Sequence, residues 1–267
     1  MLNVVERLSR RTAWLLFAWV GSILSGGLVT SLVRAPHILT GGTSIVMVSH
    51  LLGGALVACL AVAHAIWPRP IRWWPVVLVA ATAVTGWSAH RSFVPLTAAG
   101  HASLAAFATL ALAGTDSSAS ASMPSSTTSR TWRALLARVG FGLVFVQVAA
   151  GAALRQHVIA LPWHLFIGGL ATLAVLGSAF AVVHDEEDTT TSERRAARSA
   201  IAMVLVQVSL GVTVLFMMLI GPPNAGSWIG ITVAHVVVGS LTLLAVSTFA
   251  RVLNIRSAER WDNGDRQ

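Results

Sequence analysis

Four histidines begin the same short motif in different parts of the chain. The motif is His-x-x-x-small-small-Leu or Phe, and its copies are HLLGGAL, HASLAAF, HLFIGGL and HVVVGSL. The copies begin at His50, His101, His164 and His235. The small residues four positions later are Gly54, Ala105, Gly168 and Gly239. Residues four apart lie on one face of an α-helix, so the motif predicts a ligating imidazole with room beside it for a flat group.

A second motif occurs twice between copies of the first. The segments FVQVAAGAAL and LVQVSLGVTV place a glutamine four residues before a glycine, at Gln147 and Gly151 and again at Gln207 and Gly211. This spacing puts each pair on one helical face. We interpret both pairs as sites of close helix packing at a glycine.

The composition indicates which elements carry these motifs. Hydrophobic residues make up 55% of the 267 residues, and charged residues make up 10%. An ordinary soluble domain has about 25% charged residues. The composition therefore excludes a soluble enzyme, a nucleic-acid binder and a disordered protein, and it predicts a lipid bilayer as the partner of this surface.

A transmembrane helix needs about 20 apolar residues. Eight runs meet this requirement or come close to it: 13–33, 45–67, 72–89, 97–114, 134–153, 161–183, 199–220 and 227–250. The first run follows Arg7, Arg10 and Arg11 and could be a signal peptide. We expect it to be retained, because its removal would leave an odd number of helices. The chain is therefore predicted to be an all-α integral membrane protein with eight transmembrane helices.

The arginines predict the orientation of these helices. With the N-terminus in the cytoplasm, the outer segments hold only Arg34, Arg91 and Arg155. The other fifteen of the 18 basic residues fall in inner segments. This distribution follows the positive-inside rule and places both termini in the cytoplasm. Tryptophans near the span ends, such as Trp132 and Trp163, are typical of an interfacial aromatic belt.

The inner loops divide the chain into two pseudo-symmetric four-helix bundles. The Ser/Thr-rich segment 115–133 is predicted to be a flexible cytoplasmic linker between an N-terminal half, 1–114, and a C-terminal half, 134–250. The inner loop 184–198 is expected to be a solvated charged turn. The polar end, 251–267, is predicted to be a frayed cytoplasmic tail.

In this topology the even-numbered helices run inward, so the four motif histidines share one level near the outer leaflet. Ionisable residues within a membrane are costly and mark function. Zinc would gather three or four ligands at one point, whereas the repeat supplies two histidines to each half. Two imidazoles on facing helices are the natural axial ligands of heme iron. The predicted pairs are His50 with His101, and His164 with His235.

Two other features bear on this heme prediction. The outer arginines Arg34, Arg91 and Arg155 lie at the level where heme propionates would need guanidinium partners, although interfacial snorkelling explains them equally well. His90 and His157 neighbour two of these arginines, and we expect them to be solvated or to support the site rather than ligate iron.

A different layout would stack two hemes on histidines about four turns apart in each of two helices. His50 and His64 have this spacing, about 21 Å along a helix. No other predicted membrane helix has a second histidine to match, so this layout fails. Cys59 lies in an apolar run without a CxxC partner and is interpreted as a small core residue.

The arrangement of eight helices in two similar halves, with these motifs, resembles the heme A synthase family. The resemblance covers roughly 12–250 and is carried by GGLVTS at 26–31, VQVAAGAALR at 146–155, VQVSLGVTV at 206–214 and the four histidines. It implies heme b on His164 and His235, and heme O as substrate on His50 and His101. The implied reaction oxidises the C8 methyl group of heme O toward the formyl group of heme A for cytochrome oxidase assembly.

The resemblance also implies a bacterial-type plasma membrane and, as partners, heme O synthase or cytochrome oxidase assembly factors. Small-residue helix faces would permit a homo-oligomer. Family members typically have a long first outer loop with acidic residues, including a functionally important glutamate, and many have a cysteine pair there. Here the loop RAPHILTGGTS contains neither, and His37 is its titratable candidate for a catalytic group besides Arg34.

The acidic residues all fall on the predicted inner side: Glu6, Asp116, Asp185, Glu186, Glu187, Asp188, Glu193, Glu259, Asp262 and Asp265. Three hypotheses therefore stay open. The chain is a heme A synthase-type oxidoreductase, a related b-type cytochrome that transfers electrons or handles heme, or a heme-free scaffold. The histidine repeat argues against the scaffold.

Overall fold

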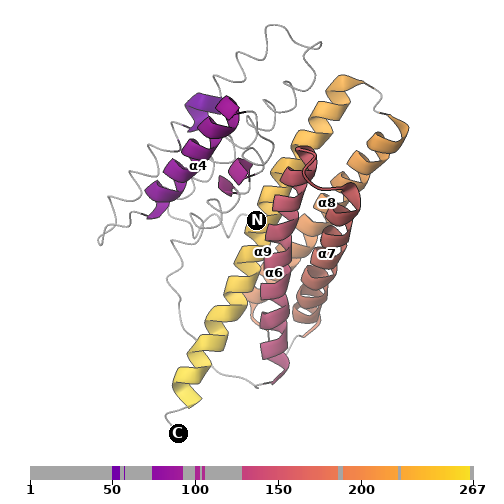
Figure 1. Ribbon diagram of the computed structural model, residues 1–267. Coiled ribbons are helices and arrows are strands. Elements are labelled where there is room, and N and C mark those ends of the chain that lie inside the picture. Colours follow the sequence, from indigo (N-terminus) through magenta and orange to yellow (C-terminus); the bar gives the residue numbers. More distant parts are fainter. Residues whose placement is uncertain are drawn as a thin grey trace. The chain divides into compact units, whose positions relative to one another are not determined.

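The structure is a computed structural model, and it describes residues 50–54, 57, 74–92, 100–102, 104–105, 128–185, 189–221 and 224–264. These ranges contain helices and turns but no strand. The long helices are α4 (Trp74–Ser92), α6 (Thr128–Arg155), α7 (Leu161–His184), α8 (Thr191–Ile220) and α9 (Ala225–Gly264), as Figure 1 shows. The prediction of an all-α chain is confirmed for the described residues.

Four of these helices are long and apolar enough to cross a membrane. The apolar spans are Trp132–Arg155, Leu161–His184, Thr191–Ile220 and Gly226–Leu253. Helix α4 holds a shorter apolar stretch, Val76–Gly86. These spans match the predicted runs from 134 onwards, whereas the run at 13–33 lies outside the described residues and those at 45–67 and 97–114 lie largely outside them.

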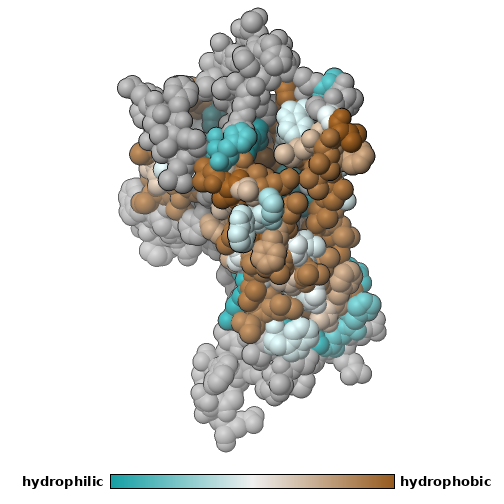
Figure 2. All heavy atoms as spheres, turned by 45° about the vertical axis from the view of Figure 1, so that its right-hand side comes forward, coloured by the Kyte–Doolittle hydropathy of each residue, from teal (hydrophilic) through white to brown (hydrophobic). Residues whose placement is uncertain are grey.

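The helices expose large apolar side chains, as transmembrane helices do toward lipid. Leu219 is 75% exposed and Leu173 is 71% exposed. Figure 2 shows hydrophobic residues over much of the described surface in view. Trp132 and Trp163, at the starts of α6 and α7, are also exposed, which fits the predicted aromatic belt. The chain is therefore an integral membrane protein.

The chain divides into two compact units. One comprises Met1–Asp116 with Gln207–Ser240, and the other comprises Ser117–Val206 with Leu241–Gln267. Helices α8 and α9 each contribute to both units. His50, His101 and His235 belong to the first unit, and His164 belongs to the second.

The core of the second unit is built largely from small residues. Its buried positions include Ala137 on α6, Ala171 and Ala179 on α7, and Ala197 and Ala200 on α8. Small side chains allow helix backbones to approach closely, which is the main source of helix association where no hydrophobic effect acts between apolar helices.

Two contacts show how closely these helices pack. A Cβ atom at Gly140 would lie 3.0 Å from Cγ2 of Val175, so α6 and α7 meet directly at this glycine. On α9, the Thr242 hydroxyl donates a hydrogen bond of 3.2 Å to the Met203 carbonyl of α8. A hydroxyl–carbonyl bond of this kind adds to packing between helices in a membrane.

Helix α8 begins at Thr191 rather than at 199, where its apolar run begins. Thr190 and Glu193 form a capping box: the Thr190 backbone N–H donates to Glu193 Oε2 across 2.6 Å, and the Glu193 backbone N–H donates to Thr190 Oγ1 across 3.3 Å. Each residue satisfies a backbone donor that a helix start would otherwise leave without an intrahelical acceptor. The Thr-x-x-Glu signal was present in the sequence.

The inner loop 184–198 is the solvated turn that we expected only in part, because Arg195 and Arg198 are exposed whereas Glu193 is buried. Glu193 is 0% exposed, and Arg133 on α6 is also buried. Arg133 Nη1 lies 2.6 Å from Asp185 Oδ2, directly after the end of α7. The capping box and this ion pair allow Glu193 and Arg133 to be buried, because each charged side chain has a protein partner in place of water.

Two helix bounds extend past their predicted limits. Helix α6 begins at Thr128, inside the predicted linker, and α9 continues to Gly264, through most of the predicted tail. The residues after Arg251 include no proline and no glycine before Gly264, so nothing in their backbone interrupts the helix. The predicted linker residues 115–127 lie outside the described residues.

Candidate functional site

His101 is held by the backbone of α4. Its Nδ1 donates a hydrogen bond of 2.8 Å to the Thr82 carbonyl, and the Thr85 hydroxyl lies 3.5 Å from the same nitrogen. The Thr82 hydroxyl is turned away, because it donates to the Leu78 carbonyl. In a neutral imidazole, donation from Nδ1 leaves the lone pair on Nε2, where it can bind a metal.

A glycine provides the space for this ring. A Cβ atom at Gly86 would lie 2.8 Å from Cε1 of His101, so a side chain here would press on the imidazole where it reaches the Thr82 carbonyl. Thr82 and Gly86 are four residues apart, the same spacing as the Gln/Gly pairs. The sequence pattern did not predict this third occurrence, because threonine replaces glutamine in it.

The structure brings His50 and His101 together within the first unit. Their ring centroids are 6.5 Å apart and their planes are inclined by 84°. A metal-bound imidazole nitrogen lies about 2 Å from its ion, so two imidazoles on opposite sides of one ion have ring centroids roughly 6 Å apart. The separation of the two rings is therefore close to this spacing.

His164 meets α6 through a glutamine and a glycine. The Gln147 amide nitrogen donates to Nε2 of His164 across 3.1 Å. A Cβ atom at Gly151 would lie 3.1 Å from Cε1 of the same imidazole. Nδ1 of His164 is buried and has no hydrogen-bond partner among the described residues.

His235 meets α8 in the same way within the other unit. The Gln207 amide nitrogen lies 3.2 Å from Nδ1 and 3.4 Å from Nε2 of His235. A Cβ atom at Gly211 would lie 3.2 Å from Cε1 of this ring. The two Gln/Gly pairs are sites of close packing, as interpreted from the sequence, and the side chain that packs there is the motif histidine.

The small residues after the histidines have different surroundings. A Cβ atom at Gly168 would lie 2.8 Å from Nε2 of Gln147, and one at Gly239 would lie 3.2 Å from Nε2 of Gln207. The space at these two glycines therefore holds a glutamine amide, where we expected room for a flat group. At Gly54 a Cβ atom would meet no atom of the described chain within 4 Å, and Ala105 is half-buried.

The remaining predicted site residues are described only in part. Arg155 ends α6 and is half-buried. His157 lies in the following turn, exposed, with a left-handed φ of 58°. The backbones of His90 and Arg91 belong to α4, but their side chains lie outside the description. Arg34, His37, Cys59 and His64 lie outside the described residues.

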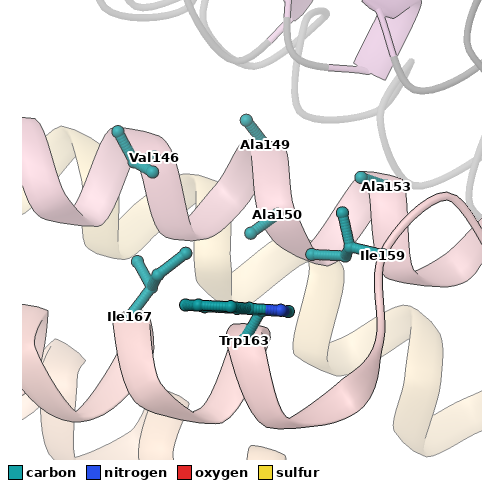
Figure 3. A pocket seen from close by; sticks show the side chains of 7 residues that line it. All are labelled: Val146, Ala149, Ala150, Ala153, Ile159, Trp163 and Ile167. Carbon is teal, nitrogen blue, oxygen red and sulfur yellow. The ribbon is translucent and has the colours of Figure 1, made fainter.

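An apolar groove of about 500 Å³ is lined by α6, α7 and the turn between them. Figure 3 shows the Trp163 indole lying between the two helices, with Ala150 pointing toward it. The lining residues are Val146, Ala149, Ala150, Ala153, Ile159, Trp163 and Ile167. None of these side chains carries a charge, so the groove suits an apolar chain or ring.

The described donors do not form a site for a bare metal ion. Within the described ranges, no three His, Cys, Asp or Glu side chains gather closely enough to hold a metal ion. A bare ion needs such a group, whereas heme iron needs only axial ligands because the macrocycle supplies the other four nitrogens. In the described part of the chain, ring nitrogens of His101, His164 and His235 lie within hydrogen-bond distance of a carbonyl or an amide.

Comparisons with known proteins identified no relative of the chain. No family model, no curated protein and no solved structure matches the chain. The interpretation of the site therefore depends on the residues and contacts given above.

Proposed function

We propose that this chain is a heme-binding membrane protein of heme A synthase type. It oxidises the C8 methyl group of heme O toward the formyl group of heme A, in the assembly of cytochrome oxidase. In this proposal eight transmembrane helices form two pseudo-symmetric four-helix bundles in a bacterial-type plasma membrane, with both termini in the cytoplasm. His50 and His101 bind the substrate heme, and His164 and His235 bind heme b.

The observation that carries the proposal is the pairing of His50 with His101. Their centroid separation of 6.5 Å has the size expected for two ligands of one iron. The Thr82 carbonyl holds Nδ1 of His101 and leaves Nε2 for the metal. An imidazole in this state is neutral, so it can remain in an apolar helix pair without the cost of a buried charge.

The chain's own residues have simple roles in this proposal. The imidazoles orient the substrate heme, and the outer arginines Arg34, Arg91 and Arg155 would pair with propionates. Heme b, when bound, supplies the redox chemistry that side chains lack. His37 is the titratable side chain that the first outer loop offers for moving a proton.

A second candidate function is a b-type cytochrome of the same fold, which transfers electrons or handles heme without oxidising it. The positions of the acidic residues in the sequence favour this candidate. All ten acidic residues fall on the predicted inner side, so no carboxylate is at the level of the motif histidines to assist an oxidation.

The test is to express the full chain in a host that makes heme O, and to analyse the pigments of the purified protein. A pyridine hemochrome spectrum and chromatography identify the hemes. Heme A or hydroxylated heme O supports the synthase. Heme b with unchanged heme O supports the cytochrome and overturns the synthase, and a preparation without heme overturns both.

Histidine variants connect the pigment to the proposed ligands. His50→Ala with His101→Ala is expected to remove the heme O-derived pigment, and His164→Ala with His235→Ala is expected to remove the b-type absorption. His157→Ala is the matched control, because this histidine is exposed in a turn. Absorption that persists in the double variants would show that the ligands lie elsewhere.

A further inference from the structure

Helices α6 and α7 exchange side chains across their interface. Gln147 of α6 lies against Gly168 of α7, and His164 of α7 lies against Gly151 of α6. The glutamine and histidine also contact each other, with 3.1 Å between Gln147 Nε2 and His164 Nε2. Each polar side chain thus occupies the space that the other helix leaves at a glycine.

Helices α8 and α9 repeat the exchange with different residues. Gln207 of α8 lies against Gly239 of α9, and His235 of α9 lies against Gly211 of α8. The amide nitrogen of Gln207 is again within 3.2 Å of an imidazole nitrogen. Two independent helix pairs therefore build the same four-residue contact, which random packing of apolar helices does not explain.

The amide carbonyl oxygens of both copies face no hydrogen-bond donor in the part of the chain that the structure describes. Oε1 of Gln147 and Oε1 of Gln207 are buried and have no hydrogen-bond partner among the described residues. An amide can donate through its nitrogen to an imidazole lone pair, or rotate so that its oxygen accepts from an imidazole N–H. Glutamine can therefore hold a neutral imidazole in either tautomer without adding a charge to the helix pair.

We propose that Gln147 and Gln207 are positioning residues for His164 and His235. The Gln147 amide contacts Nε2 of His164, and the Gln207 amide lies within hydrogen-bond distance of both ring nitrogens of His235. The four glycines leave the space that these contacts need. The inference rests on the proposed function for its ligand: when the amide oxygen accepts from the imidazole N–H, the other ring nitrogen carries the lone pair that binds heme iron.

The contact between Gln147 and the His164 ring can be tested in the heme-free protein. The full chain is labelled with ¹⁵N at histidine, and the His164 signals are identified by their loss in His164→Ala. Because a fixed tautomer separates the signals of the two ring nitrogens, Gln147→Met, which keeps the length but removes the amide, is expected to shift them toward each other. Gln156→Met, in the turn after α6, is the matched control. Unchanged His164 signals in Gln147→Met would overturn the proposal.

The glycine contact is tested by hemin binding in a double-variant cycle. A Cβ atom at Gly168 displaces the Gln147 amide, so Gly168→Ala is expected to weaken binding of hemin about 10- to 100-fold, the usual effect of disturbing the partner of a metal-bound histidine. In the Gln147→Ala background the amide is already absent, so adding Gly168→Ala should change the affinity less than about twofold. Gly169→Ala is the control, since its Cβ meets no described atom within 4 Å.

The outcomes separate the two proposals. Failure of the unmodified chain to bind hemin overturns the proposed function, while the ¹⁵N signals still decide whether the glutamines hold the imidazoles. Equal losses from Gly168→Ala in both backgrounds would show that the glycine acts through packing alone, and would overturn the positioning role. A shift in the midpoint potential of the bound heme in Gln147→Met, with the fold retained by circular dichroism, supports it.

Discussion

At the scale of single residues, His101 shows how a membrane helix can hold a polar ring. The Thr82 carbonyl that accepts from its Nδ1 already belongs to the hydrogen-bond ladder of α4. A carbonyl oxygen has two lone pairs, so it can accept from the histidine without losing its helical bond. The ring gains a partner, and no further polar side chain has to be buried.

Gly86→Ala is expected to disturb this contact. The new Cβ atom would lie 2.8 Å from Cε1 of His101, so the ring must move away from the Thr82 carbonyl. We expect hemin affinity at the N-terminal pair to fall about 10- to 100-fold. Hemin titration followed by absorption measures the loss. Gly100→Ala, where a Cβ atom meets nothing described within 4 Å, is the control, and wild-type affinity in Gly86→Ala would contradict the assignment of His101.

Gly54→Ala separates heme contact from protein packing. A Cβ atom there meets no atom of the described chain within 4 Å. Alanine favours the helix by up to about 1 kcal/mol over glycine, so the thermal stability of the heme-free protein should stay the same or rise slightly. If a macrocycle packs on this face below His50, the same change should weaken hemin binding. Unchanged binding would show that the macrocycle does not pack on this face.

At the scale of elements, the charged helix ends of the second unit matter as much as the apolar spans. The Arg133–Asp185 ion pair joins the start of α6 to the end of α7. The capping box fixes the start of α8 in the same unit. The ion pair marks the start of the α6 span and the end of α7, and the capping box marks the start of α8.

Thr190→Ala is expected to lower the free energy of unfolding by about 1 kcal/mol, the usual cost of losing an N-cap side chain. The variant loses the hydroxyl that accepts from the Glu193 N–H and donates to its carboxylate. Thermal unfolding in detergent, followed by circular dichroism, measures the change. Thr191→Ala, one position later and exposed, should have little effect, and equal effects of the two changes would contradict the capping role.

The sequence predicted the spans of the C-terminal helices well, because an apolar run of sufficient length has few alternatives in a membrane. It did not predict the partners of the polar side chains within those spans. The glutamine and histidine motifs each predicted a site, but neither motif indicated contact with the other. The small residue four positions after each histidine predicted space for a ligand. Which glycine receives which side chain depends on the register of two helices, and a single helix's pattern does not contain that information.

At the scale of the whole molecule, the orientation in the membrane is a prediction that labelling can test. Cys59 is the one cysteine of the chain, so Cys59→Ser gives a cysteine-free background. His157→Cys then places a thiol at an exposed position in the turn before α7, and Ser192→Cys places one at an exposed position in the first turn of α8. In intact cells a membrane-impermeant maleimide should label position 157 alone, and position 192 should be labelled only after permeabilisation. The reverse pattern would overturn the cytoplasmic placement of the termini.

The exchange between Gln147 and Gly168 also constrains how the sequence can change over time. Replacing Gln147 by a shorter residue creates no close contact at Gly168. Replacing Gly168 first would place a Cβ atom 2.8 Å from the Gln147 amide nitrogen. A side chain at position 168 therefore requires the Gln147 amide to move, whereas a shorter residue at position 147 leaves position 168 undisturbed. Among descendants of this chain, positions 147 and 168 should vary together, and positions 207 and 239 should follow the same rule because the same contact joins them.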